Sequence, residues 1–359
     1  MDLSGLRAEF PVLGGLAYLN AGTDGPLPTC AVRAAAAELE REAEEGRTPT
    51  HFERRTQLSG ELRALYATAL GCDTTDLALT TSTSEGIAQV IGGLKLGPGD
   101  EIVTSDEEHP GLLGALAAAR ELTGVSIRTV AFAEVANAVS PKTRLIACSH
   151  VGWMSGSLAP QELAAVDVPV LLDGAQGVGA VPVDVAALGC DAYAGAGQKW
   201  LCGPDGTGML YVSPNLREWL QVARRGYANL ANPNEGLRAR LHDDARRFDS
   251  QLLSAETLAC ALAATQLLAS ADWGTVHERA RTLAARLAEL LETRGIGVAP
   301  RGESTLVSFE RADPQAERAR LVGGGVVLRD IPGRPWLRAS VGAWNDENDL
   351  KRLLGMLSP

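Results

Sequence analysis

Lysine is scarce in this sequence, and no stretch of it is strongly basic. Only four of its 359 residues are lysines, Lys95, Lys142, Lys199 and Lys351, and arginine carries nearly all the other positive charge. The formal net charge at pH 7 is −11. Because proteins that bind nucleic acid or an anionic membrane present basic patches, we expect neither as a partner.

The sequence also lacks long hydrophobic runs and a leader-like beginning. No apolar stretch reaches the roughly 20 residues that a membrane-spanning helix needs. The first residues, MDLSGLRAEFPVLGG, contain no basic segment followed by an apolar core, so we expect no signal peptide. The six cysteines show no CxxC spacing and are typical of buried thiols in a cytoplasmic protein. The five histidines show no metal-type spacing, so we expect no metal site.

The first part of the chain alternates short apolar runs with helical segments. Strands are predicted at residues 77–81, 101–105, 125–131, 144–149, 168–172, 192–196 and 208–212. Helices are predicted at 29–46, 56–70, 111–123 and 160–165, and from about 85. This alternation predicts an α/β fold, a largely parallel sheet with helices on both faces.

The pattern changes after Val212. Residues 214–250 are polar and rich in arginine, and part of them reads as an irregular loop. Beyond them, helices are predicted at 254–269, 275–294 and 346–357, and strands at 304–310, 324–329 and 336–341. These elements predict a smaller C-terminal α+β module.

Two charged residues follow predicted strands in the stretch 168–213. Asp173 ends one apolar run, and Lys199 comes just after another. The carboxyl ends of parallel strands share one edge of an open α/β sheet, where ligands bind. A lysine amine can form a Schiff base with an aldehyde cofactor, and an aspartate can keep a pyridine nitrogen protonated. The pair therefore suits pyridoxal 5′-phosphate.

Lys199 differs from the other three lysines in its surroundings. It lies between Gly197 and Trp200, whereas the others stand beside turns or in a charged helix. Desolvation among such neighbours lowers the pKa of an amine and leaves it free to react. The alternative interpretation is a lysine at a strand end whose amine reaches water.

Hydroxyl groups and a histidine follow two earlier strands. Thr83 and Ser84 lie where a strand passes into a helix, and free N–H groups there suit phosphate. An ordinary helix cap explains the same residues. His109 follows the strand 101–105 and suits stacking on a flat ring or moving a proton. A solvated loop histidine is the alternative.

The stretch DGAQGVGAVPVDVAALGCDAYAGAGQKWLCGPDGTGMLYV carries a specific resemblance. With AYLNAGTDGPLP and WLRASVGAWNDENDLKRLL, it makes the chain resemble class-V, fold-type-I pyridoxal-phosphate enzymes nearly end to end. This family includes cysteine desulfurases, C–S lyases, isopenicillin epimerases, kynureninases and aminotransferases. The resemblance implies a large cofactor-binding domain, 1–250, whose N-terminal segment packs on a small domain, 251–359. It also implies a homodimer with the site at the subunit interface.

The resemblance gives the catalytic residues their expected roles. Lys199 is similar to the family's Schiff-base lysine, and Asp173 to the partner of the pyridine nitrogen. His109 is similar to the histidine stacked on the pyridine face, and Gln176 to the glutamine that bonds the ring hydroxyl.

Phosphate and substrate contacts follow from the same resemblance. Thr83 and Ser84 match the pair that binds phosphate. Arg338 matches the arginine that clamps the substrate carboxylate, a task suited to its two parallel hydrogen bonds. Asn20 lies in a loop that borders the substrate in the family.

Three positions depart from the family pattern. Gln198 replaces a histidine that contacts phosphate, although glutamine can still donate a hydrogen bond. Leu252 falls near a threonine that reaches the neighbouring subunit's phosphate and cannot replace it. Trp153 replaces a substrate-side asparagine, and its surroundings, SHVGWMSG, resemble the C–S lyase branch more than the desulfurases.

These features lead to a predicted activity. Desulfurases need a nucleophilic cysteine on a C-terminal loop, and the corresponding stretch 322–338 contains none. Cys202 lies on another segment, and we interpret it as a packing residue. We predict a C–S lyase that performs β-elimination on cysteine or a cysteine S-conjugate. The alternatives are an aminotransferase, an amino-acid epimerase, and a pseudoenzyme that binds the cofactor without turnover.

Overall fold

A seven-stranded sheet forms the centre of the molecule. The computed structural model describes residues 2–250 and 253–357, so Leu252 lies outside the described residues. The strands, in their order across the sheet, are β2 (Leu77–Thr80), β8 (Gly208–Val212), β7 (Ala192–Ala196), β6 (Val170–Asp173), β5 (Thr143–Ser149), β3 (Glu101–Ser105) and β4 (Ser126–Val130). β8 runs antiparallel to both neighbours, and all other pairs are parallel. The predicted α/β class is confirmed.

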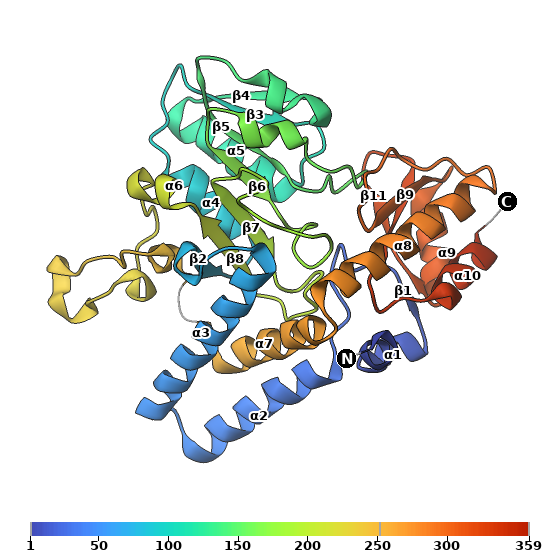
Figure 1. Ribbon diagram of the computed structural model, residues 1–359, viewed down its shortest axis with the longest axis horizontal. Helices are drawn as coiled ribbons and strands as arrows, with labels where there is room; N and C mark the ends of the chain where they lie inside the picture. The colour runs from blue at the N-terminus through green and yellow to red at the C-terminus, as the bar shows by residue number, and fades with distance from the viewer. Residues whose placement is uncertain (1, 251–252, 358–359) are drawn as a thin grey trace.

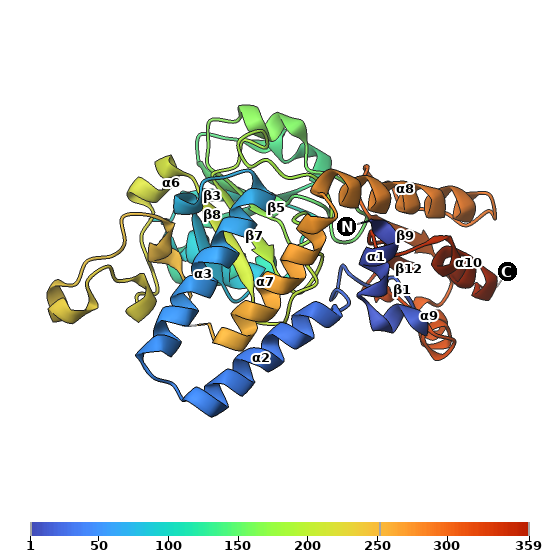
Figure 2. The ribbon, with the colours of Figure 1, turned by 60° about the horizontal axis from the view of Figure 1, so that its bottom comes forward.

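Helices cover both faces of this sheet. α4 (Thr83–Gly93) and α5 (Pro110–Thr123) share one apolar cluster with the strands. α3 (Pro49–Leu70) and α7 (Ala255–Ser270) share the cluster on the opposite face, and α2 (Thr29–Glu45) lies against α7 (Figure 2). Strands covered on both sides consist of continuous apolar runs, which is why the sequence pattern located them.

Two predicted helices differ from the structure. The helix expected at 56–70 already begins at Pro49, because proline is well suited to the first helical turn and Thr48 is extended. It ends before Gly71, whose left-handed conformation suits glycine. The helix expected at 160–165 is a short 3₁₀ turn, Gln161–Ala165, which follows Pro160.

The C-terminal part has its own small sheet. β11 (Arg329–Ile331), β12 (Trp336–Ser340) and β9 (Leu306–Glu310) pair antiparallel in that order. They lie with α8 (Trp273–Glu292), α9 (Pro314–Gly323) and α10 (Glu347–Met356) at one end of the molecule (Figure 1). The predicted strand 324–329 is interrupted at Leu328, which separates β10 (Val326–Val327) from β11. No helix among the described residues is long and apolar enough to cross a membrane.

The N-terminal segment packs on this C-terminal part. β1 (Ala17–Tyr18) pairs in parallel with β10. From α1 (Leu3–Ala8), Arg7 donates to the Asp349 carboxylate at 2.8 Å. α7, in contrast, lies against α2 and α3 below the large sheet. The domain boundary at residues 250/251 stays a prediction.

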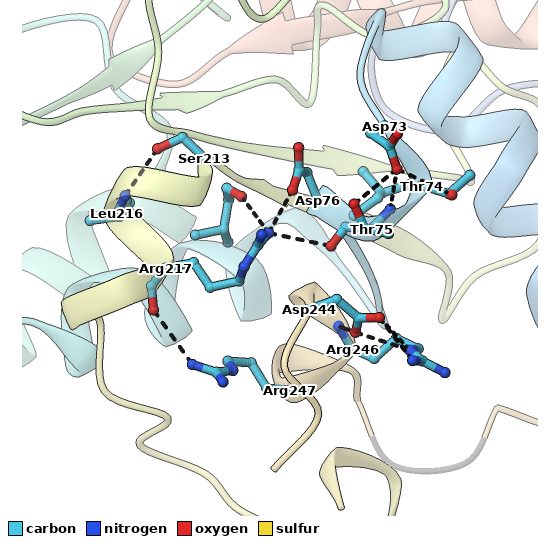
Figure 3. A network of polar contacts seen from close by, with 12 residues as sticks. Asp73, Thr74, Thr75, Asp76, Ser213, Leu216, Arg217, Asp244, Arg246 and Arg247 are labelled. Atoms are coloured by element: carbon cyan, nitrogen blue, oxygen red, sulfur yellow. Dashed lines mark hydrogen bonds and ion pairs between the residues drawn. The ribbon is translucent and has the colours of Figure 1, made fainter. Parts of the chain in front are cut away.

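Residues 220–250, here called the arm, leave the body of the molecule after α6 (Pro214–Trp219) (Figure 1). The arm contains only short 3₁₀ turns, and Leu237 near its tip is fully exposed. Figure 3 shows polar contacts that hold its base. Arg217 donates to the Asp76 carboxylate at 2.6 Å and to the Thr75 carbonyl at 3.3 Å. The body therefore fixes the base of the arm, while the tip extends into solvent.

Candidate active site

A cavity lies at the carboxyl edge of the large sheet. β3, β5, β6 and β7 are neighbours there, as predicted for parallel strands. The cavity has a volume of about 200 Å³. Eight of the ten site residues expected from the sequence line it: Thr83, Ser84, His109, Trp153, Asp173, Gln176, Gln198 and Lys199. Arg338 and Asn20 lie behind its wall.

Lys199 stands just beyond β7 with its amine largely removed from water. Burial lowers its pKa to about 8, and the positive charges of Arg338 and Arg329 act in the same direction. The negative charge of Asp173 opposes this shift. A substantial fraction of the amine is therefore neutral near physiological pH and available as a nucleophile or base.

The loop 20–25 passes directly over the backbone of Lys199. The Gly25 N–H donates to the Gln198 carbonyl at 2.8 Å. A Cβ atom at Gly25 would lie 2.0 Å from the Lys199 carbonyl oxygen, a distance that only glycine permits. This close approach locks the lysine segment against the N-terminal part of the chain.

Asp173 ends β6 and is 5% exposed. Its carboxylate accepts the Ala175 N–H at 2.9 Å. Burial raises its pKa, and the charge of Lys199 opposes the rise. Such a buried carboxylate is stabilised by a cation, so it fits a protonated ring nitrogen.

The Gln176 side chain is held at both ends of its amide. Nε2 donates to the Gly22 carbonyl at 2.7 Å, and Oε1 accepts the Trp200 indole N–H at 3.0 Å. Its orientation is therefore fixed by the protein. One N–H of Nε2 remains for a ligand oxygen.

His109 begins α5, and its Nδ1 accepts the Gly111 N–H at 3.0 Å. Burial lowers its pKa to about 4, and the nearby Lys199 and Arg329 charges add to the effect. The ring is therefore neutral near pH 7, with its proton on Nε2. The Trp153 ring meets it edge to face, with centroids 5.2 Å apart. A neutral flat ring held in this way fits stacking on a planar cofactor.

The start of α4 offers hydroxyl groups that the helix does not use. Ser82 is the N-cap, and its hydroxyl accepts the Glu85 N–H at 3.1 Å. Thr83 Oγ1 and Gln198 Oε1 are buried without a hydrogen-bond partner among the described residues. Because Ser82 caps the helix, the cap interpretation does not account for Thr83 and Ser84. The unpaired Thr83 hydroxyl and the N–H groups at this helix N-terminus fit a phosphate group, whereas Gln198 Oε1 is an acceptor.

Arg338, on β12, is fully buried. One guanidinium nitrogen donates to the Trp153 carbonyl at 2.6 Å. Within residues 2–250 and 253–357, its Nε and Nη2 have no partner. Burial and the Arg329 charge lower its pKa to about 9. A buried guanidinium with two free donors is costly, and a carboxylate would satisfy both.

Asn20 shapes the loop and does not line the cavity. Its Oδ1 accepts the Thr23 hydroxyl at 2.9 Å, and its carbonyl accepts the Thr23 N–H at 2.8 Å. Thr23 and Gly22, which the sequence reasoning did not single out, line the cavity instead. Asn20 therefore acts on the cavity through the shape of this turn.

Arg329 is a further lining residue that the sequence reasoning missed. Its guanidinium lies over the Trp153 ring, 5.4 Å from the centroid. Burial lowers its pKa. An arginine at the edge of an apolar run, VVLRD, was the available signal, but many arginines in this sequence are solvated.

Comparisons with named proteins show what this chain is similar to. Identity is 30% to a probable cysteine desulfurase of Methanothermobacter thermautotrophicus, over 66% of this chain and 62% of that protein. The isopenicillin N epimerase of Amycolatopsis lactamdurans is also 30% identical, over 93% of this chain and 92% of its own. The chain thus spans less than two thirds of the first of these relatives and nearly all of the second.

A solved protein, C-DES, has the same fold. Its lysine-to-alanine mutant, with glycine covalently linked to the PLP cofactor, matches with a TM-score of 0.92 and 27% identity over 97% of this chain and 98% of that one. The complex of this cystine C–S lyase with its product, cysteine persulfide, matches with a TM-score of 0.91 and 28% identity over 96% and 98%.

The family model of the class-V aminotransferases matches residues 17–353, which is most of the sequence. The cavity at the sheet edge, with its lysine, aspartate and unpaired hydroxyl groups, fits the cofactor of that family. The chain belongs to the class-V aminotransferase family of pyridoxal-phosphate-dependent enzymes.

Proposed function

We propose that this enzyme removes a sulfur group from cysteine or a cysteine S-conjugate by β-elimination. The products are a thiol or sulfide, a keto acid and ammonia. The observation that supports this reaction is that no cysteine lines the cavity among the described residues. Cys202 is fully buried, and burial raises its thiol pKa, so it is not a nucleophile. Sulfur must then leave as a small molecule.

The cavity residues are assigned to the cofactor as follows. Pyridoxal phosphate, when bound, supplies an electron sink for the electron pair left at the substrate Cα. Asp173 would keep the ring nitrogen of the bound cofactor protonated, and the neutral His109 ring would stack against that ring. Thr83 would donate its unpaired hydroxyl to the phosphate, and Gln198 would have to donate from its amide nitrogen, because its unpaired Oε1 is an acceptor.

Substrate residues act from two sides. Arg338 binds the amino-acid carboxylate through its free Nε and Nη2 donors, which fixes the α-hydrogen. Lys199 removes that proton as general base, since a pKa of about 8 suits proton transfer near neutral pH. The electron pair then expels the sulfur substituent as a thiolate.

Arg329 favours a substrate with a second acidic group. It brings another positive charge to the cavity wall and lies against the flat Trp153 ring. A disulfide-linked amino acid such as cystine carries a second carboxylate, whereas cysteine does not. We therefore expect cystine-like substrates to be preferred over cysteine, and the group that leaves such a disulfide on elimination is a persulfide, because the S–S bond stays intact.

Epimerisation is the second candidate function. It begins with the same proton removal and differs in where the proton returns. The 30% identity to an isopenicillin N epimerase over 93% of this chain supports it. Transamination and cofactor binding without turnover are the remaining alternatives, and neither has a specific observation in its favour.

We also propose that the enzyme is a homodimer. The middle of the arm carries the fully exposed Leu237, the exposed Tyr227 and several exposed arginines, whereas both ends of the arm pack on the body. A second copy is the simplest surface that would cover these side chains.

Product analysis tests the proposed reaction. Purified enzyme is mixed with cysteine, cystine and S-conjugates in turn, while cofactor absorbance, keto acid and sulfide are measured. Pyruvate with a released thiol supports elimination. Loss of optical activity without pyruvate supports the epimerase, and a pyridoxamine spectrum without pyruvate supports the aminotransferase. Lys199→Ala should abolish turnover, whereas Lys95→Ala, at an exposed lysine, should not.

A further inference from the structure

A buried carboxyl group lies behind the cavity and has no role in the reaction described above. Glu108 directly precedes His109 and is 4% exposed. It does not line the cavity. A buried carboxylate is costly unless hydrogen bonds or a cation compensate for lost water, so its place here requires an explanation.

Hydrogen bonds hold Glu108 across the ends of two neighbouring strands. Ser105, the last residue of β3, donates its hydroxyl to Oε1. Ser149, the last residue of β5, donates its N–H to Oε1 at 3.1 Å and its hydroxyl to Oε2 at 2.6 Å. Both carboxylate oxygens are therefore acceptors, an arrangement that suits the ionised form.

Ser149 connects Glu108 to Asp173. Ser149 and Asp173 are the last residues of β5 and β6 and are register partners in the sheet. The Asp173 carbonyl accepts the N–H of His150, the residue after Ser149, at 2.9 Å. Asp173 and the Cys148 thiol are the titratable groups that interact with Glu108. Burial raises the pKa of Glu108 to about 7, the serine hydrogen bonds lower it, and the Asp173 charge raises it.

Two buried carboxylates side by side repel each other unless a cation lies near both. Lys199 supplies part of this positive charge, because its amine interacts with Asp173. A protonated ring nitrogen held by Asp173 would supply more. Charges in such a low-dielectric region influence one another over longer distances than in water.

We propose that Glu108 is a positioning residue for the cofactor. Glu108 fixes the strand end that carries Asp173 and adds a second negative charge behind the Asp173 carboxylate. This inference rests on the proposed cofactor binding. The charge stabilises positive charge on the cofactor and on the nitrogen that links it to Lys199. By linkage, cofactor binding in turn favours the ionised form of Glu108.

The variant Glu108→Gln separates charge from shape. Glutamine can still accept the Ser149 N–H and donate to a serine hydroxyl, but it is neutral. We expect the pH at which the cofactor absorbance of the loaded enzyme titrates to fall by about one unit. We also expect the cofactor dissociation constant, from fluorescence quenching, to rise about tenfold.

Two further variants test the hydrogen bond and the place of the charge. Ser149→Ala removes one hydrogen bond that favours the ionised carboxylate, so it should shift the absorbance titration in the same direction as Glu108→Gln but by less. Glu38→Gln removes a buried carboxylate on α2 whose partners, Arg41 and Arg54, do not line the cavity. Its absorbance titration should match that of the wild type.

A folded Glu108→Gln enzyme whose cofactor absorbance titrates as in the wild type would overturn the inference. An equal shift in Glu38→Gln would also overturn it, because the loss of any buried carboxylate, and not of the charge behind Asp173, would then be the cause. If the wild type itself shows no lysine-linked cofactor band, the proposed function fails, and this inference fails with it.

Discussion

The cavity and the arm are both rich in charged residues, but the arginines differ in burial and in hydrogen-bond partners. Behind the cavity wall, Arg338 is fully buried, and two of its nitrogens lack partners among the described residues. At the base of the arm, Arg217 pairs with Asp76 at 2.6 Å (Figure 3). Further along the arm, Arg224 has 74% of its side chain exposed. Charge serves stability at the base of the arm and solvation beyond it, whereas in the cavity it is held ready for a ligand.

This difference extends to proton binding. Burial lowers the pKa of Lys199 to about 8 and that of His109 to about 4. Burying these two groups lowers the free energy of unfolding, but it makes their neutral, reactive forms available near neutral pH. Matched substitutions at the cavity and at sites away from it test this contrast.

The largest expected effect concerns the two arginines. Arg338→Met should lower kcat/KM by about 10³-fold, mainly through KM, because a buried charged hydrogen-bond donor is lost. Its free energy of unfolding should not fall, since a buried charge with unpaired donors is removed. Arg217→Met should leave kcat/KM unchanged and lower the free energy of unfolding by about 1–3 kcal/mol. Steady-state kinetics and urea unfolding measure both, and an unchanged KM in Arg338→Met would refute the carboxylate role.

Glycine substitutions give the next effect. Gly25→Ala would place Cβ 2.0 Å from the Lys199 carbonyl, so the loop must move. We expect a loss of about 3 kcal/mol in unfolding free energy, together with loss of activity. Gly236→Ala in the arm meets nothing within 4 Å, but its φ of 58° and ψ of −130° are a conformation that favours glycine. That change should cost about 1–3 kcal/mol without loss of activity. Equal losses of activity in the two variants would show that loop 20–25 is not constrained by Lys199.

Lys199 should make stability depend on pH. The pKa is about 8 in the folded chain and 10.5 in the reference state, so the unfolded chain binds more protons between these values. Wild-type stability therefore rises with pH across this window, and the full penalty is present below pH 8.

In cofactor-free protein at pH 7, Lys199→Met should be about 3 kcal/mol more stable than the wild type, because the shift of the pKa from 10.5 to about 8 already includes the attraction to Asp173. The gain should disappear by about pH 11, above both pKa values. Urea unfolding across pH measures it, and Lys95→Met controls for the loss of a charge at an exposed site. A pH-independent difference would contradict the burial of an amine that can titrate.

The smallest effect on folding is expected at the tip of the arm. Leu237 is fully exposed, so Leu237→Asp should change the unfolding free energy of a monomer by less than about 0.5 kcal/mol. It should nevertheless weaken self-association about tenfold or more, as measured by analytical ultracentrifugation. A wild-type protein that stays monomeric at all concentrations would rule out the proposed dimer.

The sequence predicted the large sheet well and the helix limits less well. Strands buried on both faces are continuous apolar runs between glycines and prolines, and this signal does not depend on distant residues. The start of α3 was missed because residues 49–55 are mostly polar, and the helix was inferred from its later apolar positions. Leu252 lies outside the described residues, so its expected place near a neighbouring phosphate stays a prediction.

The candidate site was partly predictable for the same reason. Lys199 and Asp173 follow strands, so the topology alone brings them to one edge. No such signal marked Arg329, Thr23 or Glu108. Their roles depend on contacts with residues far away in the chain. Arg338 was found only through family resemblance, and the roles of all these residues stay predictions until the variants are measured.

The sequence by itself determined which residue types are available and where strands end, since those depend on local apolar pattern and turn residues. It thereby determined the α/β class, the family and the pairing of a lone lysine with an aspartate. Only the tertiary structure decided how far each group is removed from water and which polar atoms lack partners. Desolvation and hydrogen bonding depend on segments that are hundreds of residues apart, such as loop 20–25 and β12 around the cavity. For this reason the size of the Lys199 pKa shift, whose direction the sequence indicated, and the free donors of Arg338 could not be read from the sequence.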